Sequence, residues 1–374
     1  MKDLEINTNL NVNFQIDFVS NFFSTNPLIN DKCFGTDRRF IVIDELIAPL
    51  YLKKLKNLLL ANNLKPFFYI ISCQETDKNL DTLIGILQEV ENYGLMRKSE
   101  PIVAIGGGVL CDIVGFAASI YRRGVPYIKI PTTLIGIIDV SVGVKTGINF
   151  KQRRNRLGSY HPPTKSILDK YFLQSLDRIH IVSGLGEIFK ISLIKSFKLF
   201  DLLEHHGKAL LDSKFQISGI SDEVLYHSVE EMRVELETNL WEKNLKRCVD
   251  FGHSFSPLIE MRSLEKNNFQ PLTHGQAVAI DCLFSSVISH LRGYLNIDDI
   301  KRLVKVMKSL ELPTEHELFY DYTFVIEALN DTMKHRDGNQ YLPIPVKIGE
   351  YTFINDLSIY EIKKTIEVLK NLNS

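Results

Sequence analysis

The sequence predicts an α/β protein of two domains: a parallel sheet with crossover helices over residues 1–176, then a helical domain over residues 177–374. Two observations support this prediction. In the first half, short apolar runs alternate with helical stretches, which is typical of a parallel sheet whose strands are joined by helices. From about Phe172 onward, long segments of helical periodicity follow one another with few strand signals. A chain of 374 residues is long enough for both domains.

The elements follow in order along the chain. Short apolar or β-branched runs predict strands at residues 39–44, 66–72, 102–105 and 127–130. Amphipathic periodicity predicts helices of the first domain at residues 80–93 and 109–121. The last strand stops at Pro131, before Thr132 and Thr133. Helices of the second domain are expected at residues 184–206, 222–242, 275–291, 297–310 and 358–372.

Composition narrows the class of protein. The formal net charge is -1, so no global basic field exists to attract nucleic acid. The five cysteines are odd in number and form no CxxC pair, which favours a reducing compartment over a disulfide framework. The first residues carry acids where a signal peptide is apolar, and no apolar run approaches the roughly 18–20 residues of a membrane span. A cytoplasmic enzyme with a small-molecule substrate and no nucleic-acid or membrane partner is therefore expected.

A glycine run, Gly106-Gly107-Gly108, lies directly after the strand at 102–105 and opens a helix that contains Asp112. Such a turn lets a phosphate-bearing ligand approach the backbone N–H groups at the helix N-terminus. A tight strand-to-helix turn, with Asp112 as an acid favoured by the helix dipole, explains the same residues equally well. The run does not match the GxGxxG dinucleotide fingerprint.

Three residues have the chemistry of metal ligands. Glu187 lies on an otherwise apolar helical stretch, with Lys190 three residues later on the same face. Burying both is costly unless they are paired or functional, so a simple buried ion pair is the alternative. His253 stands in VDFGHSFSPLIE, and His274 in PLTHGQAVAIDC at a predicted helix start. His205 and His206, by contrast, are expected at a helix C-terminus, where histidine suits the dipole.

The segment around His253 is interpreted as a helix. In that case Lys246, Asp250 and Pro257 share the face of His253, at spacings of i−7, i−3 and i+4. Whatever directs His253 toward a metal ion then directs these three residues toward the substrate.

The string GGGVLCDIVGFAASIYRRGVPYIKIPTTLIGIIDVSVGVKTGIN resembles the central signature of dehydroquinate synthases and related sugar-phosphate cyclases. The resemblance implies a Rossmann-like NAD-binding domain, a helical domain that binds a divalent metal such as zinc or cobalt, and a homodimer. It implies three metal ligands, Glu187, His253 and His274. For NAD, it implies roles for Asp44, Glu75, Lys78, Gly107, Gly108, Asp112, Thr132 and Thr133, with Asp139 and Lys145 at the nicotinamide end.

The resemblance also implies roles toward the substrate. Lys190, Lys145 and Arg154 would act on phosphate or alkoxide charge, Asn155 would position the substrate, and Lys334 would lie near the phosphate. Arg154 stands where the family usually has lysine, and Cys111 where dehydroquinate synthases have glycine. The reaction implied is transient oxidation by NAD, elimination of phosphate, return of the hydride and intramolecular aldol closure.

The departures from dehydroquinate synthases indicate the branch. That family carries Arg, Asn and His where this chain has Lys246, Asp250 and Pro257, and a lysine in place of Met232. Fewer cations and one added carboxylate disfavour a carboxylate substrate and suit a polyhydroxylated one. The segments around His253 and Lys334 look like the C7-cyclitol branch, closest to 2-epi-5-epi-valiolone synthases, which use sedoheptulose 7-phosphate. Other cyclases, forming desmethyl-4-deoxygadusol, 2-epi-valiolone or 3-dehydroquinate, and metal-dependent polyol dehydrogenases remain the alternatives.

Overall fold

The computed structural model describes residues 3–24, 27–151, 153–265 and 269–373. The chain forms two compact units, one of residues 1–131 with 143–169, the other of residues 132–142 with 170–374. The short segment 132–142 thus belongs to the second unit, although it lies inside the first predicted domain. The domain boundary near Leu176 stays a prediction.

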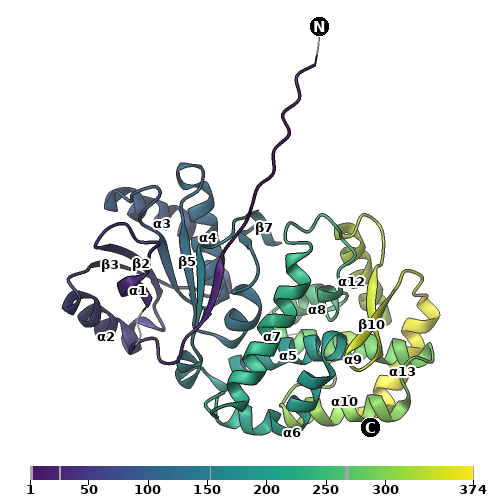
Figure 1. Cartoon of the computed structure of the whole chain (residues 1–374). Helices are drawn as coiled ribbons and strands as arrows, with labels where there is room; N and C mark the ends of the chain where they lie inside the picture. Colours follow the sequence, from purple (N-terminus) through teal and green to yellow (C-terminus); the bar gives the residue numbers. More distant parts are fainter. Residues whose placement is uncertain (1–2, 25–26, 152, 266–268, 374) are drawn as a thin grey trace. The chain divides into compact units, whose positions relative to one another are not determined.

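The first unit is built on a six-stranded sheet in the order β1-β8-β5-β4-β2-β3, with every neighbouring pair parallel (Figure 1). The inner strands β4 and β5 are buried along their whole length, as expected for apolar strands of a parallel sheet. The strands are β1 (Gln15–Phe18), β2 (Arg38–Asp44), β3 (Lys65–Ile71), β4 (Ile102–Gly106), β5 (Tyr127–Pro131) and β8 (Lys165–Leu168). A separate antiparallel hairpin is formed by β6 (Lys145–Phe150) and β7 (Arg153–Tyr160).

The helices of this unit begin and end where local chemistry directs them. Asn79 caps one of them by accepting a hydrogen bond from the Thr82 backbone N–H, and Gly94, with φ of 67°, ends it in the left-handed region. The helices are α1 (Pro27–Asn30), α2 (Ala48–Ala61), α3 (Leu80–Tyr93) and α4 (Gly108–Ile120), with 3₁₀ turns η1 (Glu75–Asp77) and η2 (Tyr121–Arg123). The four predicted strands and two predicted helices are confirmed to within a residue at each end. Strands β1, β6, β7 and β8 and helix α2 were not predicted.

The second unit is helical, as predicted, with one added hairpin. The helices are α5 (Arg178–Lys195), α6 (Phe197–Asp212), α7 (Ile220–Glu237), α8 (Ser256–Ser263), α9 (His274–Leu291), α10 (Ile297–Ser309), α11 (Glu317–Tyr320), α12 (Tyr322–His335) and α13 (Ile359–Asn373). Shorter turns are the π-helical η3 (Gly136–Val140) and the 3₁₀ helices η4 (Lys170–Ser175) and η5 (Cys248–Asp250). The antiparallel hairpin consists of β9 (Leu342–Lys347) and β10 (Glu350–Ile354).

The helix predicted at residues 184–206 is wrong. The stretch 184–206 is not continuous, because α5 ends at Lys195 and α6 begins at Phe197. Ser196 separates them with an extended backbone, and its side chain caps α6 by accepting from the Leu199 N–H. His205 and His206 therefore lie inside α6, not at its C-terminus.

Helices α5 and α9 touch at two glycines. A Cβ atom on Gly186 would collide with the backbone of Gly275, and one on Gly275 would collide with the backbone of Ser183. The Gly275 N–H also donates to the Ser183 hydroxyl at 3.1 Å. Only glycine at both positions allows this backbone approach, and the residues beside these two glycines are Glu187 and His274.

All five cysteines are free. Among the residues that the structure describes, no helix combines the length and apolar character that a membrane crossing requires.

Candidate active site

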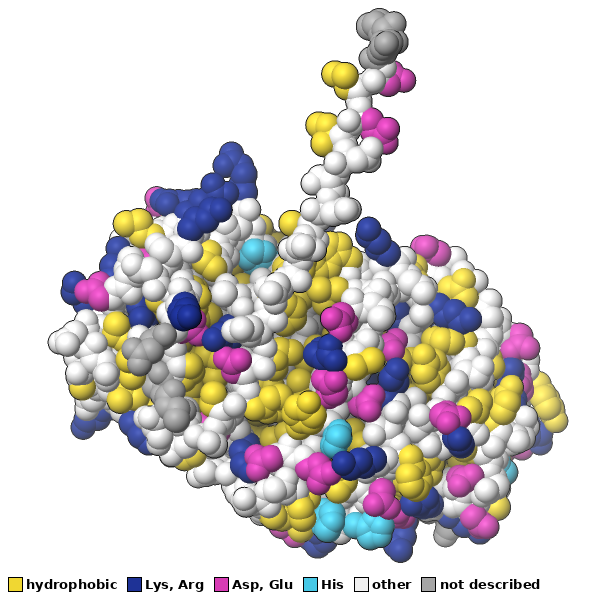
Figure 2. Space-filling model, in the orientation of Figure 1, with side chains coloured by type: hydrophobic (Ala, Val, Ile, Leu, Met, Phe, Trp, Pro, Cys, Tyr) yellow, Lys and Arg dark blue, Asp and Glu magenta, His cyan; other side chains and the backbone are white. Residues whose placement is uncertain are grey.

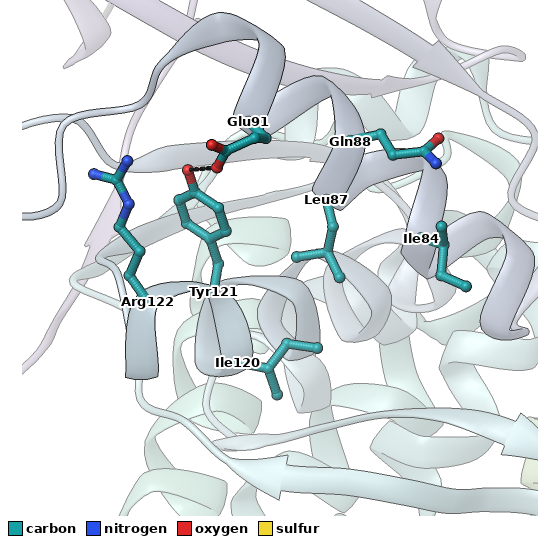
Figure 3. A pocket seen from close by; sticks show the side chains of 7 residues that line it. All are labelled: Ile84, Leu87, Gln88, Glu91, Ile120, Tyr121 and Arg122. Carbon is teal, nitrogen blue, oxygen red and sulfur yellow. Dashed lines mark hydrogen bonds between the residues drawn. The ribbon is translucent and has the colours of Figure 1, made fainter.

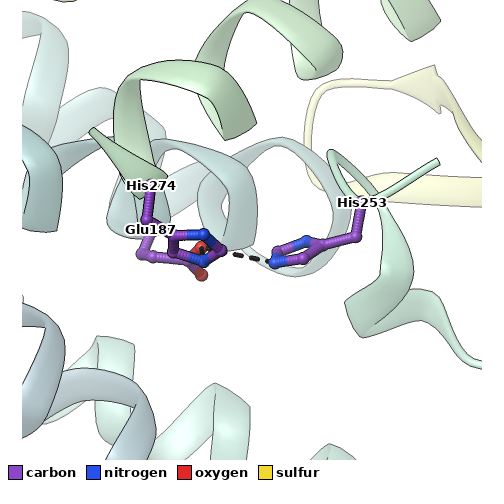
Figure 4. A group of neighbouring side chains, drawn as sticks. All are labelled: Glu187, His253 and His274. Carbon is purple, nitrogen blue, oxygen red and sulfur yellow. Dashed lines mark ion pairs between the residues drawn. The ribbon is translucent and has the colours of Figure 1, made fainter. Parts of the chain in front are cut away.

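Three side chains from separate segments of the second unit meet, as predicted. Glu187 comes from the middle of α5, His253 from the loop between η5 and α8, and His274 is the first residue of α9 (Figure 4). Their candidate ligand atoms all lie within 4.8 Å of one another. Glu187 Oε1 is 3.3 Å from His274 Nε2 and 3.7 Å from His253 Nε2.

The imidazoles are oriented by their other ring nitrogens. His274 Nδ1 lies 3.0 Å from Glu260 Oε2, and His253 Nδ1 lies 3.2 Å from the Phe251 carbonyl oxygen. Since the Nδ1 atoms face these oxygens, the Nε2 atoms are the ring nitrogens that face Glu187. A carboxylate or carbonyl behind each imidazole is the usual arrangement for metal-ligating histidines.

Glu187 is a buried carboxylate whose pairing is incomplete. It is 1% exposed, and neither of its oxygens accepts a hydrogen bond of good geometry in the described part of the chain. The Lys190 ammonium lies 2.6 Å from Oε2. Burial opposes the charge, but Lys190 and the two histidines outweigh it and hold the pKa of Glu187 well below its ordinary value. The site therefore keeps an ionised carboxylate out of water.

The two histidines respond to this charge in opposite ways. Burial, helped by the charge of Lys190, lowers the pKa of His253 to about 3. Burial also disfavours the charged form of His274, but the nearby carboxylates of Glu187 and Glu260 outweigh it and raise its pKa to about 10. Two imidazole nitrogens and a carboxylate oxygen are a donor set that suits zinc or a similar ion and leaves coordination positions open. The residues present thus fit a divalent cation.

Asp281 fixes the loop that carries His253. This fully buried residue of α9 accepts hydrogen bonds from the backbone N–H groups of Ser254, Phe255 and Ser256 at 2.9, 2.6 and 2.8 Å. It thereby caps α8, whose own N-cap residue, Phe255, provides no side-chain bond. On the other side, the Thr332 hydroxyl donates to the Ser254 carbonyl oxygen at 2.9 Å. The sequence interpretation did not identify Asp281, Glu260 or Thr332.

The helix predicted through His253 is wrong. The chain forms the short turn η5, passes through Gly252 at φ of 72°, and begins α8 only at Ser256. A Cβ atom on Gly252 would lie 2.7 Å from Cys282 Sγ, so the turn packs tightly against α9. The i−7, i−3 and i+4 argument for Lys246, Asp250 and Pro257 therefore does not hold.

Asp250 is nevertheless close to His253, because the two residues are joined by a backbone hydrogen bond of the turn and not by a shared helix face. The His253 N–H donates to the Asp250 carbonyl oxygen at 3.0 Å. The Asp250 carboxylate pairs with Arg247 at 2.6 Å and lies 3.5 Å from Arg336 Nε. Arg247 also pairs with Glu242. Asp250 is thus held between two guanidinium groups, neither of which the sequence interpretation singled out.

Lys246 and Lys334 lie in exposed positions. The Lys246 ammonium lies 4.8 Å from the centre of the Phe353 ring. The Lys334 side chain is 74% exposed and pairs at 3.5 Å with Asp331 on its own helix. Arg336, two residues after Lys334, is the buried cation of this segment.

In the first unit, five predicted residues form one network. Lys78 is buried, and its ammonium donates to Asp112 and to the Asn155 side chain, each at 2.6 Å. Glu75 lies 3.3 Å from Arg154 Nε and accepts from Asn149 at 2.8 Å. Asn149 closes the network, because its side-chain oxygen accepts from the Asn155 N–H at 2.9 Å. The sequence interpretation missed Asn149.

The other predicted cofactor residues of the first unit lie near strand ends. Asp44 ends β2 and accepts from the Leu46 N–H; burial raises its pKa. Gly107 is the N-cap of α4 and Gly108 its first residue, directly after β4. Because β2 and β4 are parallel neighbours, these residues share the carboxyl edge of the sheet, where α/β proteins bind ligands. Lys145 begins β6 and is exposed.

Three predicted residues open the second unit. Thr132 is buried, with no hydrogen-bond partner for its hydroxyl among the described residues. Thr133 accepts from the Gly136 N–H at 3.1 Å. Asp139 lies in η3, and its charge helps Glu187 to raise the pKa of the buried Lys190 against the effect of burial.

Two other features are weaker candidates. A hollow between α3 and η2 is lined by Ile84, Leu87, Gln88, Glu91, Ile120, Tyr121 and Arg122 and contains none of the predicted site residues (Figure 3). A second acidic cluster, of Asp201, Glu204 and His205, is partly exposed, and Glu204 is paired with Arg302. Neither has the buried, incompletely paired carboxylate that distinguishes the Glu187 cluster.

Comparison with known proteins agrees with this arrangement. The family model described as 3-dehydroquinate synthase N-terminal matches residues 68–183, and its C-terminal counterpart matches residues 184–337. A 2-epi-5-epi-valiolone synthase of Streptomyces albus is 44% identical over 343 residues, covering 90% of this chain and 82% of the relative. A demethyl-4-deoxygadusol synthase of Trichormus variabilis is 32% identical, covering 96% and 88%.

A solved structure is similar over the full length. It is ValA, a 2-epi-5-epi-valiolone synthase from Streptomyces hygroscopicus subsp. jinggangensis with NAD+ and Zn2+ bound. Its TM-score is 0.92 at 40% identity, covering 98% of this chain and 99% of ValA. The matched segments contain the Lys78 network and the Glu187 cluster, and the chain therefore belongs to the 3-dehydroquinate synthase family.

Proposed function

We propose that this protein is a 2-epi-5-epi-valiolone synthase: an NAD- and divalent-metal-dependent sugar-phosphate cyclase that converts sedoheptulose 7-phosphate to a C7 cyclitol with loss of phosphate. The proposal is supported by four valiolone synthases at 42–44% identity to this chain over 88–90% of its length. The observation that carries it is the convergence of His253 and His274 on the Glu187 carboxylate, which is 1% exposed.

Glu187, His253 and His274 would hold the metal ion. ValA, with Zn2+ bound, supports zinc, and a 2-deoxy-scyllo-inosose synthase with Co2+ bound keeps cobalt as the alternative. Glu260 and Asp281 have positioning roles, because one orients the His274 ring and the other fixes the loop of His253.

NAD would be held by the residues at the carboxyl edge of the sheet and by the Lys78 network. The backbone N–H groups after Gly107 suit the pyrophosphate, because they lie at the N-terminus of α4. Asp44, Glu75, Lys78 and Asp112 supply the polar contacts, together with Gly108, Thr132 and Thr133. ValA, with NAD+ bound, supports this cofactor.

The bound groups would supply hydride transfer and Lewis-acid polarisation of a substrate hydroxyl. The chain's own residues provide the electrostatics. The Lys190 ammonium, held against Glu187, is placed to stabilise negative charge on an oxygen that forms beside the metal ligands. The charges of Glu187 and Asp139 together raise the pKa of that ammonium against the effect of burial. Lys145 and Arg154 are assigned to phosphate or alkoxide charge, Asn155 to positioning, and Lys334 to the phosphate. The role of Lys246 toward the substrate was based on a helix that the chain does not form.

Asp250 supports a polyhydroxylated substrate over a carboxylate-bearing one. Its carboxylate is buried between Arg247 and Arg336. Because Glu242 also pairs with Arg247, two carboxylates balance two guanidinium groups, and the remaining lone pairs of Asp250 can accept from hydroxyl groups. We propose Arg336 and Arg247 as additional positioning residues, since they fix the orientation of this carboxylate.

The decisive experiment incubates the enzyme with NAD+, Zn2+ or Co2+, and sedoheptulose 7-phosphate. A cyclase releases one phosphate per product and accumulates no NADH, which is followed by the absorbance of reduced nicotinamide at about 340 nm. Steady accumulation of NADH without phosphate release would instead identify a polyol dehydrogenase.

A second cyclase activity is kept because a demethyl-4-deoxygadusol synthase is 32% identical over most of the chain. Mass spectrometry and NMR of the product distinguish 2-epi-5-epi-valiolone from demethyl-4-deoxygadusol and from 2-epi-valiolone. We also propose that the protein is a homodimer. A reducing, cytoplasmic compartment is proposed as well, and the free cysteines support that compartment.

A further inference from the structure

The hairpin of β6 and β7 is irregular at the place that carries Arg154 and Asn155. Its register shifts at Asn149 of β6, which lies alone opposite residues 154–156 of β7. Asn155 has φ of 50°, in the left-handed region that asparagine tolerates better than most residues. Bulges of this kind bend a strand and change the direction of its side chains, often beside an active site.

The bulge allows two successive side chains to contact the same turn. In a regular strand, neighbouring residues point to opposite faces of the sheet. Here Arg154 Nε lies 3.3 Å from Glu75 Oε1, and the Asn155 side chain accepts from the Lys78 ammonium at 2.6 Å. The η1 turn begins at Glu75, and Lys78 directly follows it. The residues assigned to NAD are therefore joined to those assigned to the substrate through this bulge.

Asn149 holds the bulge against the η1 turn. Its side-chain oxygen accepts from the Asn155 N–H at 2.9 Å, and its Nδ2 donates to Glu75 Oε1 at 2.8 Å. Its own backbone N–H donates to the Lys78 carbonyl oxygen at 2.7 Å. One half-buried side chain thus fixes the left-handed residue on one side and the carboxylate that faces Arg154 on the other.

An amide suits both partners of this side chain. The Asn155 N–H requires an acceptor and the Glu75 carboxylate requires a donor, so the two partners also fix which way the amide points. A carboxylate at position 149 would still accept from the Asn155 N–H, but it would meet the like charge of Glu75 at hydrogen-bond distance. An alanine would provide neither contact.

The placement of single cations matters because the surface as a whole does not favour an anion. The formal net charge is -1, and basic and acidic side chains are interspersed on the face shown in Figure 2. A phosphorylated substrate is therefore attracted by individual cations and not by a broad basic field. Since the attraction between charges falls with distance, the position of Arg154 decides how much it contributes.

We propose that Asn149 is a positioning residue of the cyclase. By holding the bulge of β7 against the η1 turn, it keeps Arg154 and Asn155 in the positions assigned to the substrate, next to Glu75 and Lys78. The inference rests on the proposed function, because it gives Asn149 a part in the turnover of a sugar phosphate. Asn149 acts through its neighbours, so its loss should affect turnover more than the binding of NAD+ or metal.

The first test measures turnover of sedoheptulose 7-phosphate by the full-length zinc enzyme at saturating NAD+. Asn149→Ala should lower kcat/KM at least about thirtyfold, because Arg154 and Asn155 lose their alignment. Its zinc content should be unchanged, and its dissociation constant for NAD+ should stay within about fivefold of wild type. Asn62→Ala, which removes an exposed side-chain bond to the Leu58 carbonyl oxygen, is the matched control and should leave kcat/KM unchanged. A kcat/KM of Asn149→Ala within about threefold of wild type, or a loss of NAD+ affinity as large as the loss of turnover, would overturn the proposal.

A double variant separates positioning from a general loss of folding. Asn149→Asp opposes two carboxylates and should lower kcat/KM at least about tenfold. In Asn149→Asp with Glu75→Gln, amide and carboxylate exchange places and the acceptor for the Asn155 N–H is kept. This double variant should regain at least about fivefold in kcat/KM over Asn149→Asp, although Glu75→Gln alone lowers it. Additive losses would show that the two side chains do not act together, and the proposal would then be wrong.

Hydrogen exchange tests the placement of the bulge without any substrate. With NAD+ and zinc bound, the amides of residues 153–158 should exchange at least about tenfold faster in Asn149→Ala than in wild type or Asn62→Ala. Equal exchange in wild type and Asn149→Ala contradicts the placement, whatever the substrate is. A wild type that releases no phosphate from sedoheptulose 7-phosphate contradicts the proposed function instead, and the two failures are thereby distinguished.

Discussion

The Lys78 network and the Glu187 cluster differ in how completely their charged groups are hydrogen-bonded within the protein. In the first unit, the Lys78 ammonium is buried but donates to both Asp112 and Asn155 at 2.6 Å. In the second unit, Glu187 is also buried, and the Lys190 ammonium lies 2.6 Å from one oxygen, while two imidazole nitrogens lie 3.3 and 3.7 Å from the other. The first cluster is a scaffold that stands without a ligand. The second keeps an ionised carboxylate between an ammonium and two imidazole nitrogens and leaves coordination positions open, so it is where a divalent cation would bind.

The largest effect is expected for Glu187→Gln, which removes the charge from the incomplete cluster. Zinc affinity should fall by about a thousandfold or more, since a charged ligand is lost, and phosphate release should cease. Metal content is measured on the dialysed protein. Glu204→Gln, in the exposed acidic cluster, is the control and should leave both unchanged. Full zinc occupancy in Glu187→Gln would place the metal elsewhere.

The next effect concerns the lysine that partly satisfies Glu187. Lys190→Met should lower the free energy of unfolding of the metal-free protein by about 3–5 kcal/mol, because a buried carboxylate loses its partner. Added zinc should recover most of this loss. Lys195→Met breaks a half-buried pair with Glu235 and should cost about 1 kcal/mol or less, with or without zinc. Urea unfolding with zinc or with chelator checks both; a loss in Lys190→Met that zinc does not reduce would contradict the comparison.

The comparison also predicts independence of the two clusters. Lys78→Gln should weaken NAD+ binding by about tenfold to a hundredfold, since two charge-assisted contacts are lost, while zinc content stays unchanged. Titration calorimetry with NAD+ measures this. Lys65→Gln, which removes a surface pair with Asp37, is the control. If Lys78→Gln loses zinc as well, the network is not confined to the cofactor.

A smaller effect is expected behind the metal ligands. Asp281→Ala leaves three backbone N–H groups of the His253 loop without their acceptor and should lower zinc affinity by about tenfold to a hundredfold. Asp281→Asn retains an acceptor and should restore most of the affinity. The visible spectrum of the Co2+-loaded protein should shift in the alanine variant only, and Ser285→Ala is the control. Identical spectra in all variants would deny Asp281 a positioning role.

The smallest effect is a pH dependence of Asp281. Burial, only partly offset by its hydrogen bonds, raises its pKa to about 6. Because the folded-state value lies above the unfolded one, ionisation costs stability above pH 6, and that cost disappears as the pH falls toward 4. Between pH 7 and 4.5, wild type should gain about 2 kcal/mol relative to Asp281→Asn in the free energy of unfolding. A difference that is flat or of opposite sign would contradict the raised pKa.

Sequence reasoning succeeded where an unusual residue stood in an apolar context. Glu187 is an acid inside an apolar helix, and the structure brings it to the two predicted histidines. The same reasoning could have found Asp281, an isolated acid in the apolar stretch AVAIDCLF, and Glu260. Their partners are 27 and 14 residues away along the chain, so no local periodicity reports the pairing.

Helical periodicity was the wrong basis for the segment of Asp250. Gly252 takes a left-handed conformation that breaks any helix through His253, and its close packing against Cys282 and Val278 is a tertiary contact that the local sequence does not report. Arg336 was missed for a related reason. Lys334, two residues before it, has the same charge. Only burial distinguishes the two side chains, and burial depends on tertiary packing that the local sequence does not show.

The glycine contact between α5 and α9 has a consequence for ion selectivity. Because Gly186 and Gly275 bring two backbones together one residue away from Glu187 and His274, the span between carboxylate and imidazole is set by main chain that cannot close further. Ions of different radius must therefore be accommodated by rotation of the ligand side chains. The backbone contact at Gly186 and Gly275 thus sets a lower limit on the separation of Glu187 and His274, and so on the size of the ion that the site prefers.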